Sequence, residues 1–347
     1  MKGRKALILH NLVTAASPKD ELDVLVQAAE VEKALSELGY RATVVPFSLD
    51  VEKAVRSIRK ADPLFVFNLV ESVAGDGRLI HLAPALLDHL GLPFTGSGQE
   101  AIFVTSNKLL GKKLLRQAGI ATPPWLEGGS LPARMNGPVS AAGGKETDVA
   151  GTYLLKSVWE HASNWFADDS IVRVNDAGGL RAALEKKNRG GGRFFAERYI
   201  EGREFNQAIL AGEILPMSEI RFVEFPDDKL RIVDFRAKWE VDSFEYSHTL
   251  RSLDFSAADR PLLEELRAVA RRCWDGLGLG GYARVDFRVD RDNRPWVLEI
   301  NVNPCLSPDS GFHAAAERAG LSFTALVKRI VDDCLERFGK AERRAEE

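Results

Sequence analysis

The stretch GYARVDFRVDRDNRPWVLEINVNP, residues 281–304, carries the strongest chemical signal in the sequence. Two runs that are rich in branched and aromatic residues, a composition typical of strands, flank Asp292-Asn293 within it. Both of these residue types tolerate the positive φ angles of a tight turn. The sequence therefore predicts a β-hairpin over residues 282–301 with a two-residue turn at its tip.

Acidic side chains face each other in this predicted hairpin. A two-residue turn pairs Asp286 with Glu299. The same register pairs Arg284 with Asn301, and the alternation of side chains along a strand puts all four on one face. Opposed carboxylates repel, so Mg²⁺, which prefers oxygen ligands and shares carboxylates with nucleotide phosphates, is the natural compensating cation. The alternative is a solvated face on which Arg284 and Arg288 neutralise the acids.

The overall composition favours small-molecule chemistry. The chain has 347 residues, 45% of them hydrophobic, which is enough for two or three packed domains. Its 47 Lys and Arg nearly balance 50 Asp and Glu, so no basic field attracts nucleic acid or a membrane surface. The three cysteines form no CxxC pair, and no apolar run is long enough for a signal peptide or a membrane span. We therefore expect a cytoplasmic protein.

Predicted strands and helices alternate along the first hundred residues. We expect strands at 6–10, 42–47 and 63–68, and helices at 22–38, 51–60 and 80–90. Such alternation is typical of a parallel sheet covered by helices, an α/β arrangement. We expect this first domain to end near Gly98.

The rest of the chain mixes helices and strands in an α+β pattern. A basic amphipathic helix is predicted near 106–117, and we interpret its lysines as a solvated face rather than a nucleic-acid contact. Residues 127–152 are rich in Gly, Ser, Pro and Ala without a hydrophobic period, which predicts a flexible insertion. Further strands are predicted at 153–157, 170–174 and 193–199, and further helices at 179–187, 261–277 and 322–338.

Eight segments in a fixed order resemble the D-alanine–D-alanine ligase branch of the ATP-grasp superfamily. They are GLPFTGSG, SNKLLGKKLLRQAGI, LLKS, FAERYIEGREFN, ILPMSEI, DFRAKW, the hairpin, and NPCLSPDS. The resemblance implies an ATP-grasp fold with a Rossmann-like domain at 1–100. It further implies a central subdomain at 101–195, which contains the insertion, and a C-terminal subdomain at 196–347 that carries the metal site.

The resemblance also implies a nucleotide-binding role for each matching residue. Lys108, Lys156, the lid residue Ser163 and the mobile-loop residue Lys238 match groups that hold the phosphates of ATP. The adenine amino group, the ribose hydroxyls and the adenine hinge would be contacted by Glu197, by Glu204, and by Tyr199 with Ile200. Lys156 stands in an apolar run, where an unpaired ammonium would be costly, so an anionic partner is expected there.

The implied reaction joins a carboxylate to an amine through an acyl phosphate, with release of ADP and phosphate. Asp286, Glu299 and Asn301 match the ligands of two Mg²⁺ ions, with Mn²⁺ as an alternative metal. Arg284 matches the group that stabilises the tetrahedral intermediate, and Ser310 matches a serine that binds a substrate carboxylate. The resemblance leaves the oligomer open, with a homodimer among the options.

The departures from the family pattern concentrate on the first amino-acid site. Val70-Glu71 replaces a His-Gly pair, Ala162 replaces a lid serine, Trp239 replaces a tyrosine and Cys305 replaces a glycine. We therefore hypothesise a carboxylate substrate other than D-alanine, with loops 160–166 and 239–252 as lids that exclude water. The alternatives are a true D-alanine–D-alanine ligase of peptidoglycan synthesis, and a kinase-like ATP-binding protein without ligase activity.

Overall fold

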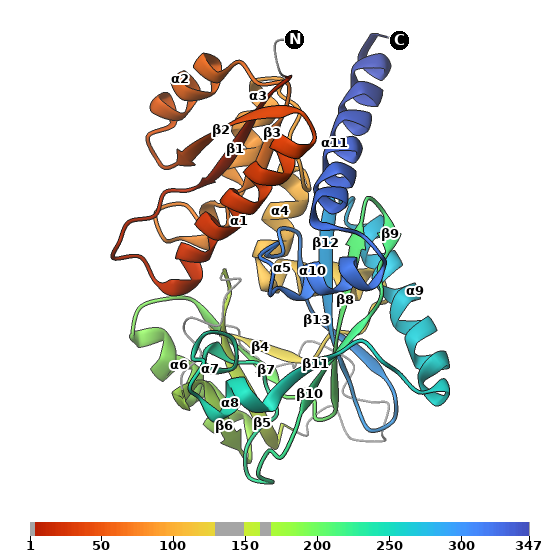
Figure 1. Cartoon of the computed structure of the whole chain (residues 1–347). Helices are drawn as coiled ribbons and strands as arrows, with labels where there is room; N and C mark the ends of the chain where they lie inside the picture. Colours follow the sequence, from red (N-terminus) through yellow and green to blue (C-terminus); the bar gives the residue numbers. More distant parts are fainter. Residues whose placement is uncertain (1–3, 129–148, 160–167, 347) are drawn as a thin grey trace.

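The chain forms three β-sheets within the residues that the structure, a computed structural model, describes (Figure 1). The described segments are residues 4–128, 149–159 and 168–346. Most of the predicted insertion at 127–152 lies outside them. The predicted lid at 160–166, including Ser163, lies outside them completely.

The first sheet is parallel, as the alternation of predicted strands and helices indicated. Its strands run in the order β2-β1-β3, namely β2 (Tyr40–Phe47), β1 (Arg4–Asn11) and β3 (Val66–Leu69). The helices of this part are α1 (Lys19–Glu37), α2 (Val51–Ala61), η1 (Gly77–Leu79) and α3 (Leu82–His89). Successive residues of β1 enter two different hydrophobic clusters, with α1 on one side and α2 and α3 on the other, so helices cover both faces.

The second sheet is antiparallel and lies in the middle of the chain. Its strands run in the order β4 (Trp125–Glu127), β7 (Phe194–Arg198), β5 (Gly151–Ser157) and β6 (Ile171–Val174). The helices of this part of the chain are α4 (Gln99–Ser106), α5 (Lys108–Gln117), η2 (Asp168–Ser170) and α6 (Ala177–Arg189). Leu180 and Leu184 of α6 pack on Tyr153 and Leu155 of β5. The predicted basic helix is α5, but its Lys112 is buried, so the interpretation of a wholly solvated lysine face was wrong.

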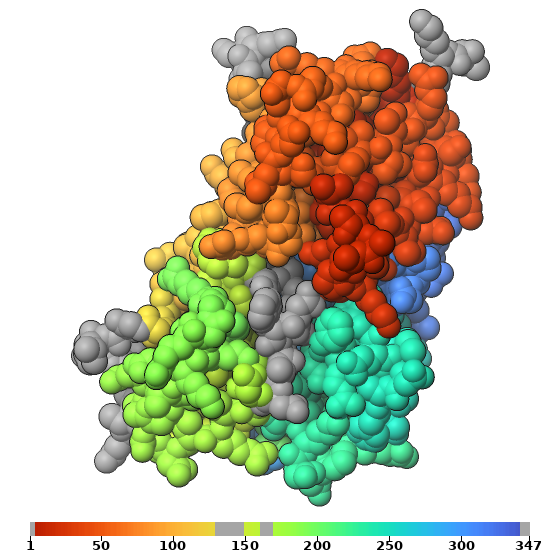
Figure 2. All heavy atoms as spheres, turned by 90° about the vertical axis from the view of Figure 1, so that its left-hand side faces the viewer, coloured from red at the N-terminus to blue at the C-terminus, as the bar shows by residue number. Residues whose placement is uncertain are grey.

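The third sheet is antiparallel and carries the hairpin. Its main strands run in the order β11 (Thr249–Ser252), β10 (Ser218–Phe222), β8 (Arg203–Leu210), β12 (Tyr282–Val289) and β13 (Pro295–Asn301), while β9 (Glu213–Ile214) pairs with β8. Its helices are α7 (Phe235–Trp239), α8 (Phe244–His248), η3 (Ala257–Asp259), α9 (Arg260–Gly276), α10 (Gly311–Arg318) and α11 (Phe323–Glu346). In Figure 2 the segment with α6 and the segment with α7 and α8 form two separate lobes below the N-terminal residues.

The hairpin has the predicted pairing but not the predicted turn. Val289 pairs with Pro295, so five residues, 290–294, make the connection, and Asn293 takes the positive φ of 59°. The prediction of a two-residue turn was therefore wrong. A β-bulge after Asp286 shifts the register by one residue and compensates, so Asp286 still faces Glu299 as predicted.

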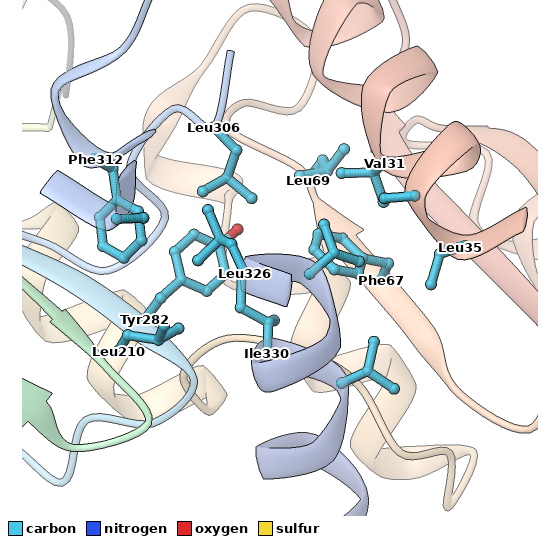
Figure 3. Packing of buried hydrophobic residues seen from close by; sticks show 14 of the residues in the cluster. Val31, Leu35, Phe67, Leu69, Leu210, Tyr282, Leu306, Phe312, Leu326 and Ile330 are labelled. Atoms are coloured by element: carbon cyan, nitrogen blue, oxygen red, sulfur yellow. The ribbon is translucent and has the colours of Figure 1, made fainter. Parts of the chain in front are cut away.

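One hydrophobic core joins the first sheet to the third. Figure 3 shows Val31 of α1 and Phe67 of β3 facing Tyr282 of β12 and Leu326 of α11 across this cluster. At its edge Gly281 approaches Gly96 so closely that a Cβ on Gly281 would lie 2.6 Å from the Gly96 backbone. The first sheet and its helix α1 are therefore packed directly against β12, the strand that carries Asp286, one of the predicted metal ligands.

Candidate active site

The hairpin face holds a tightly bonded arginine and carboxylate. Arg284 donates from Nε to Asp286 Oδ1 and from Nη2 to Oδ2, both at 2.7 Å. Asn206 of β8 adds a third donor, with Nδ2 2.8 Å from Asp286 Oδ1. Burial alone would lower the pKa of Arg284, but the charges of Asp286 and Glu299 outweigh it and raise that pKa above the ordinary value. The guanidinium is therefore a permanent, oriented cation beside the two acids.

The acids of this face have a donor set that suits a hard cation. Asp286, Glu299 and Asn301 offer carboxylate and amide oxygens along the paired strands β12 and β13. Within the described residues no group of three or more His, Cys, Asp and Glu side chains could hold a metal by itself. This set therefore fits an ion that takes further oxygens from a bound phosphate, as Mg²⁺ commonly does.

Arg288 does not neutralise the hairpin acids, contrary to the alternative drawn from the sequence. Its Nη2 lies 3.1 Å from Glu204 Oε2, on the neighbouring strand β8. Burial raises the pKa of Glu204, and Arg288 opposes this shift. Lys238 and Lys156 also act electrostatically on Glu204, so these residues, predicted from separate segments, share one neighbourhood.

A lysine, a glutamate and a second lysine form a row of ion pairs between the second sheet and α5. Lys156 of β5 lies 2.5 Å from Glu197 Oε1, which supplies the anionic partner that the sequence predicted. Lys112 of α5 lies 2.7 Å from the other oxygen, Oε2. Burial opposes the charge of Lys156, but Glu197, Glu299 and Glu204 together hold its pKa above the usual value.

The predicted adenine hinge directly follows β7. Tyr199 donates its backbone N–H to Thr152 O at 2.9 Å, so this N–H is already used within the protein. The Tyr199 ring lies 5.4 Å from the Arg288 guanidinium. Ile200 is the next residue and is half-buried.

The remaining predicted phosphate contacts lie at the edges of the site. Lys108 is the first residue of α5, and its backbone N–H donates to Val158 O at 2.9 Å. Lys238 is exposed on α7. The segment that contains α7 is anchored by Glu245, whose Oε1 lies 2.5 Å from Lys229 and 3.2 Å from Arg236.

Ser310 begins α10 and is accompanied by an arginine that the sequence analysis did not single out. The Ser310 hydroxyl accepts a hydrogen bond from the His313 N–H at 3.2 Å. Arg251 of β11 donates to the carbonyl oxygens of Asp309 and Ser310 at 3.2 and 3.4 Å. Burial and the nearby Arg284 both lower the pKa of Arg251, so two guanidinium groups lie near the start of this helix. The sequence contained no signal for this proximity.

Two positions at which the sequence departs from the family pattern lie in an acidic cluster whose side chains are hydrogen-bonded to one another. Asp23 of α1 accepts from Ser307 Oγ at 2.9 Å and from Cys305 Sγ at 3.0 Å. Gln27, one turn further on, donates to Glu71 Oε1 at 2.9 Å. Burial raises the pKa of Glu71 to about 7. The departures from the family pattern at positions 71 and 305 thus lie in one cluster.

Comparison with known proteins finds similarity to D-alanine–D-alanine ligases. A family described as the D-alanine–D-alanine ligase C-terminus matches residues 170–332. The D-alanine–D-alanine ligase of Synechococcus sp. (strain JA-3-3Ab) is 32% identical over 321 residues, 90% of this chain and 89% of that protein. That of Moorella thermoacetica is 30% identical over 332 residues, 93% and 98% of the two chains. The crystal structure of D-alanine–D-alanine ligase from Bacillus anthracis with ATP superposes with a TM-score of 0.73 at 21% identity, over 98% of this chain and all of that one.

The fold and the similarity to these ligases together define an ADP-forming ligase of the ATP-grasp class. Within that class, the chain belongs to the D-alanine–D-alanine ligase family. None of the described helices is long and apolar enough to cross a membrane.

Proposed function

We propose that the chain forms an amide or peptide bond from a carboxylate other than D-alanine. The supporting observation is the cluster of Glu71, Gln27, Asp23 and Cys305, in which Glu71 belongs to the pair that replaces the family's His-Gly and Cys305 stands where the family has a glycine. Glu71 adds a carboxyl group at the position of the family's His-Gly pair, and Asp23 is hydrogen-bonded into the same cluster, so the charge and the hydrogen bonding offered to the first substrate differ. A true D-alanine–D-alanine ligase is the second candidate, and the similarity to named ligases favours it.

The proposed reaction has two steps. A carboxylate oxygen of the first substrate attacks the γ-phosphorus of ATP, the bond from that phosphorus to the bridging oxygen breaks, and ADP leaves. The amine nitrogen of the second substrate then attacks the carbonyl carbon of the acyl phosphate, phosphate leaves and the nitrogen loses a proton. Because little covalent chemistry falls to the protein, its contribution is position and charge.

Charged side chains divide this work in the proposal. Lys156 and Lys108 hold the ATP phosphates, and Lys238 closes over them with its loop. Arg284 stabilises negative charge on the carbonyl oxygen in the second step, for which its bonds to Asp286 preorganise it. The serine at the start of α10, Ser310, binds the carboxylate of the second substrate.

The nucleotide and metal roles complete the proposal. Glu197, Tyr199, Ile200 and Glu204 bind the nucleoside, and Ser163 belongs to the same set. Two Mg²⁺ ions, replaceable by Mn²⁺, are held by Asp286, Glu299 and Asn301. When bound, they neutralise phosphate charge.

Product formation with a panel of substrates tests this proposal. Purified protein with Mg-ATP is given D-alanine alone, and then pairs of amino acids and dipeptides, while ADP release and new peptide products are followed by coupled assay and mass spectrometry. We expect ADP release that requires both a carboxylate and an amine, and a turnover with some pair that exceeds turnover with D-alanine. D-alanyl-D-alanine as the best product would instead establish the second candidate.

The organisation of the chain is also part of the proposal. We propose units at 1–100, 101–195 and 196–347, which the three separate sheets support. We further propose a cytoplasmic enzyme that binds neither nucleic acid nor membranes, and a homodimer as its assembly. The near balance of basic and acidic residues, with a formal charge of -3, supports the absence of nucleic-acid binding.

A further inference from the structure

Lys112 is a buried cation whose surroundings fix it from three sides. Its side chain is 2% exposed, and Nζ lies 2.7 Å from Glu197 Oε2. The same ammonium donates to Thr122 Oγ1 at 2.7 Å and lies 5.3 Å from the centre of the Trp125 ring. Burial lowers the pKa of Lys112 to about 8, although Glu197 opposes the shift. A lysine is seldom buried this completely unless a partner compensates its charge.

The next lysine along the helix is different. Lys113 has a side chain that is 49% exposed and pairs with Glu127 at 3.0 Å. Such an exposed pair contributes little to stability. The two neighbours therefore carry the same charge on the same helix, and only one of them reaches the site.

Lys112 acts on the site through Glu197. Because each oxygen of the Glu197 carboxylate is bonded to a different lysine, the position of Lys112 determines the orientation of the carboxylate that Lys156 contacts. Lys156 in turn is close enough to Glu299 and Glu204 to be influenced by their charges. The row thus connects α5 to the hairpin acids through two side chains.

We propose that Lys112 is a positioning residue for the nucleotide: it fixes the Glu197 carboxylate so that Lys156 is held in place to bind phosphate. This inference rests on the proposed role of Lys156 in binding ATP. Lys112 touches neither substrate in this scheme. Its effect is to remove rotational freedom from Glu197 before the nucleotide arrives, which lowers the cost of binding.

Direct titration of Mg-ATP binding tests the inference. Affinity is measured by calorimetry for the wild type, Lys112→Met and Lys113→Met, and thermal unfolding is measured separately for each. We expect Lys112→Met to weaken Mg-ATP binding by tenfold or more in protein that is still folded, and Lys113→Met to bind within twofold of the wild type. A purely structural lysine would lower the unfolding temperature and leave the affinity of the folded protein unchanged, which would overturn the inference.

A double variant keeps the test valid if Lys112→Met does not fold. Lys112→Met with Glu197→Gln removes both charges of the Lys112–Glu197 pair, so no carboxylate is left without its Lys112 partner, and Lys156 keeps the influence of Glu299 and Glu204. We expect the double variant to bind Mg-ATP as weakly as Glu197→Gln alone, because Lys112 acts through Glu197. Losses of Mg-ATP binding free energy that add in the double variant, or wild-type affinity in that variant, would refute the coupling between Lys112 and Glu197. Failure of the wild type itself to bind Mg-ATP would instead contradict the proposed function.

Discussion

Gln27 donates its side-chain amide to Glu71 at 2.9 Å, and the same nitrogen lies 3.2 Å from Asp23 Oδ2. One amide group thus stands between two carboxyl groups. Burial raises the pKa of Glu71 from the usual 4.5 to about 7, and the negative charge of Asp23 adds to this effect. Glu71 therefore gains a proton more readily in the folded protein than in the unfolded chain.

This raised pKa predicts a pH-dependent stability. A carboxyl with a higher pKa in the folded state stabilises the fold below its unfolded pKa of 4.5, and this contribution is lost as the pH rises through about 7. We expect Glu71→Gln, which cannot ionise, to gain about 1 to 3 kcal/mol of unfolding free energy over the wild type between pH 5 and pH 8. Urea unfolding of both proteins at pH 5 and pH 8 measures this gain. A difference in unfolding free energy between them that is the same at both pH values would contradict a raised pKa of Glu71.

Removal of a charge at Asp286 should strongly reduce ligase turnover. Asp286→Asn keeps the shape of the side chain but weakens its bonds to Arg284 and its affinity for a divalent ion. Since changes around a metal ligand already cost about 10- to 100-fold, we expect kcat/KM to fall by at least about 100-fold. The rate of ADP release at increasing Mg²⁺ concentration gives both kcat/KM and the apparent affinity for the divalent ion. Asp292→Asn, exposed in the turn of the same hairpin, is the control and should retain full activity.

A methyl group at Gly281 should destabilise the contact between the first and third sheets. Gly281 has φ +68°, and a Cβ there would lie 2.6 Å from backbone atoms of Gly96. Strain and overlap together predict a loss of about 3 kcal/mol for Gly281→Ala in chemical unfolding. Gly91→Ala has a similar φ of +64° with no atom within 4 Å, so it should lose only about 1 kcal/mol. Equal losses would show that the close approach is relieved elsewhere.

The loop that carries Lys238 should open more often when its anchor is weakened. Glu245 is buried and forms ion pairs with both Lys229 and Arg236, so Glu245→Gln removes the negative charge from both pairs. A loss of about 1.4 kcal/mol would raise local opening tenfold, and we expect limited proteolysis within residues 226–248 to accelerate accordingly. Glu240→Gln changes only an exposed pair with Arg236 and should leave the cleavage rate unchanged.

The sequence predicted elements with a clear period better than contacts between distant segments. The parallel first sheet and the pairing of Asp286 with Glu299 followed from alternation along the strands. The turn length was wrong because a one-residue bulge leaves no separate mark in the sequence. The buried position of Lys112 on α5 depends on Glu197, which is on the distant strand β7, and helical periodicity cannot reveal such a partner. Arg251 was missed for the same reason, since its partners follow β13.

The hydrophobic core that α11 completes limits which segments can be exchanged between related proteins. Leu326 and Ile330 of this last helix pack with Val31 and Phe67, which come from the other end of the chain. A chimera that took only the first hundred residues from another ligase would join two halves of an interior that were selected in different proteins. We therefore expect a chimera to keep this interior intact only when the first and last segments come from the same parent.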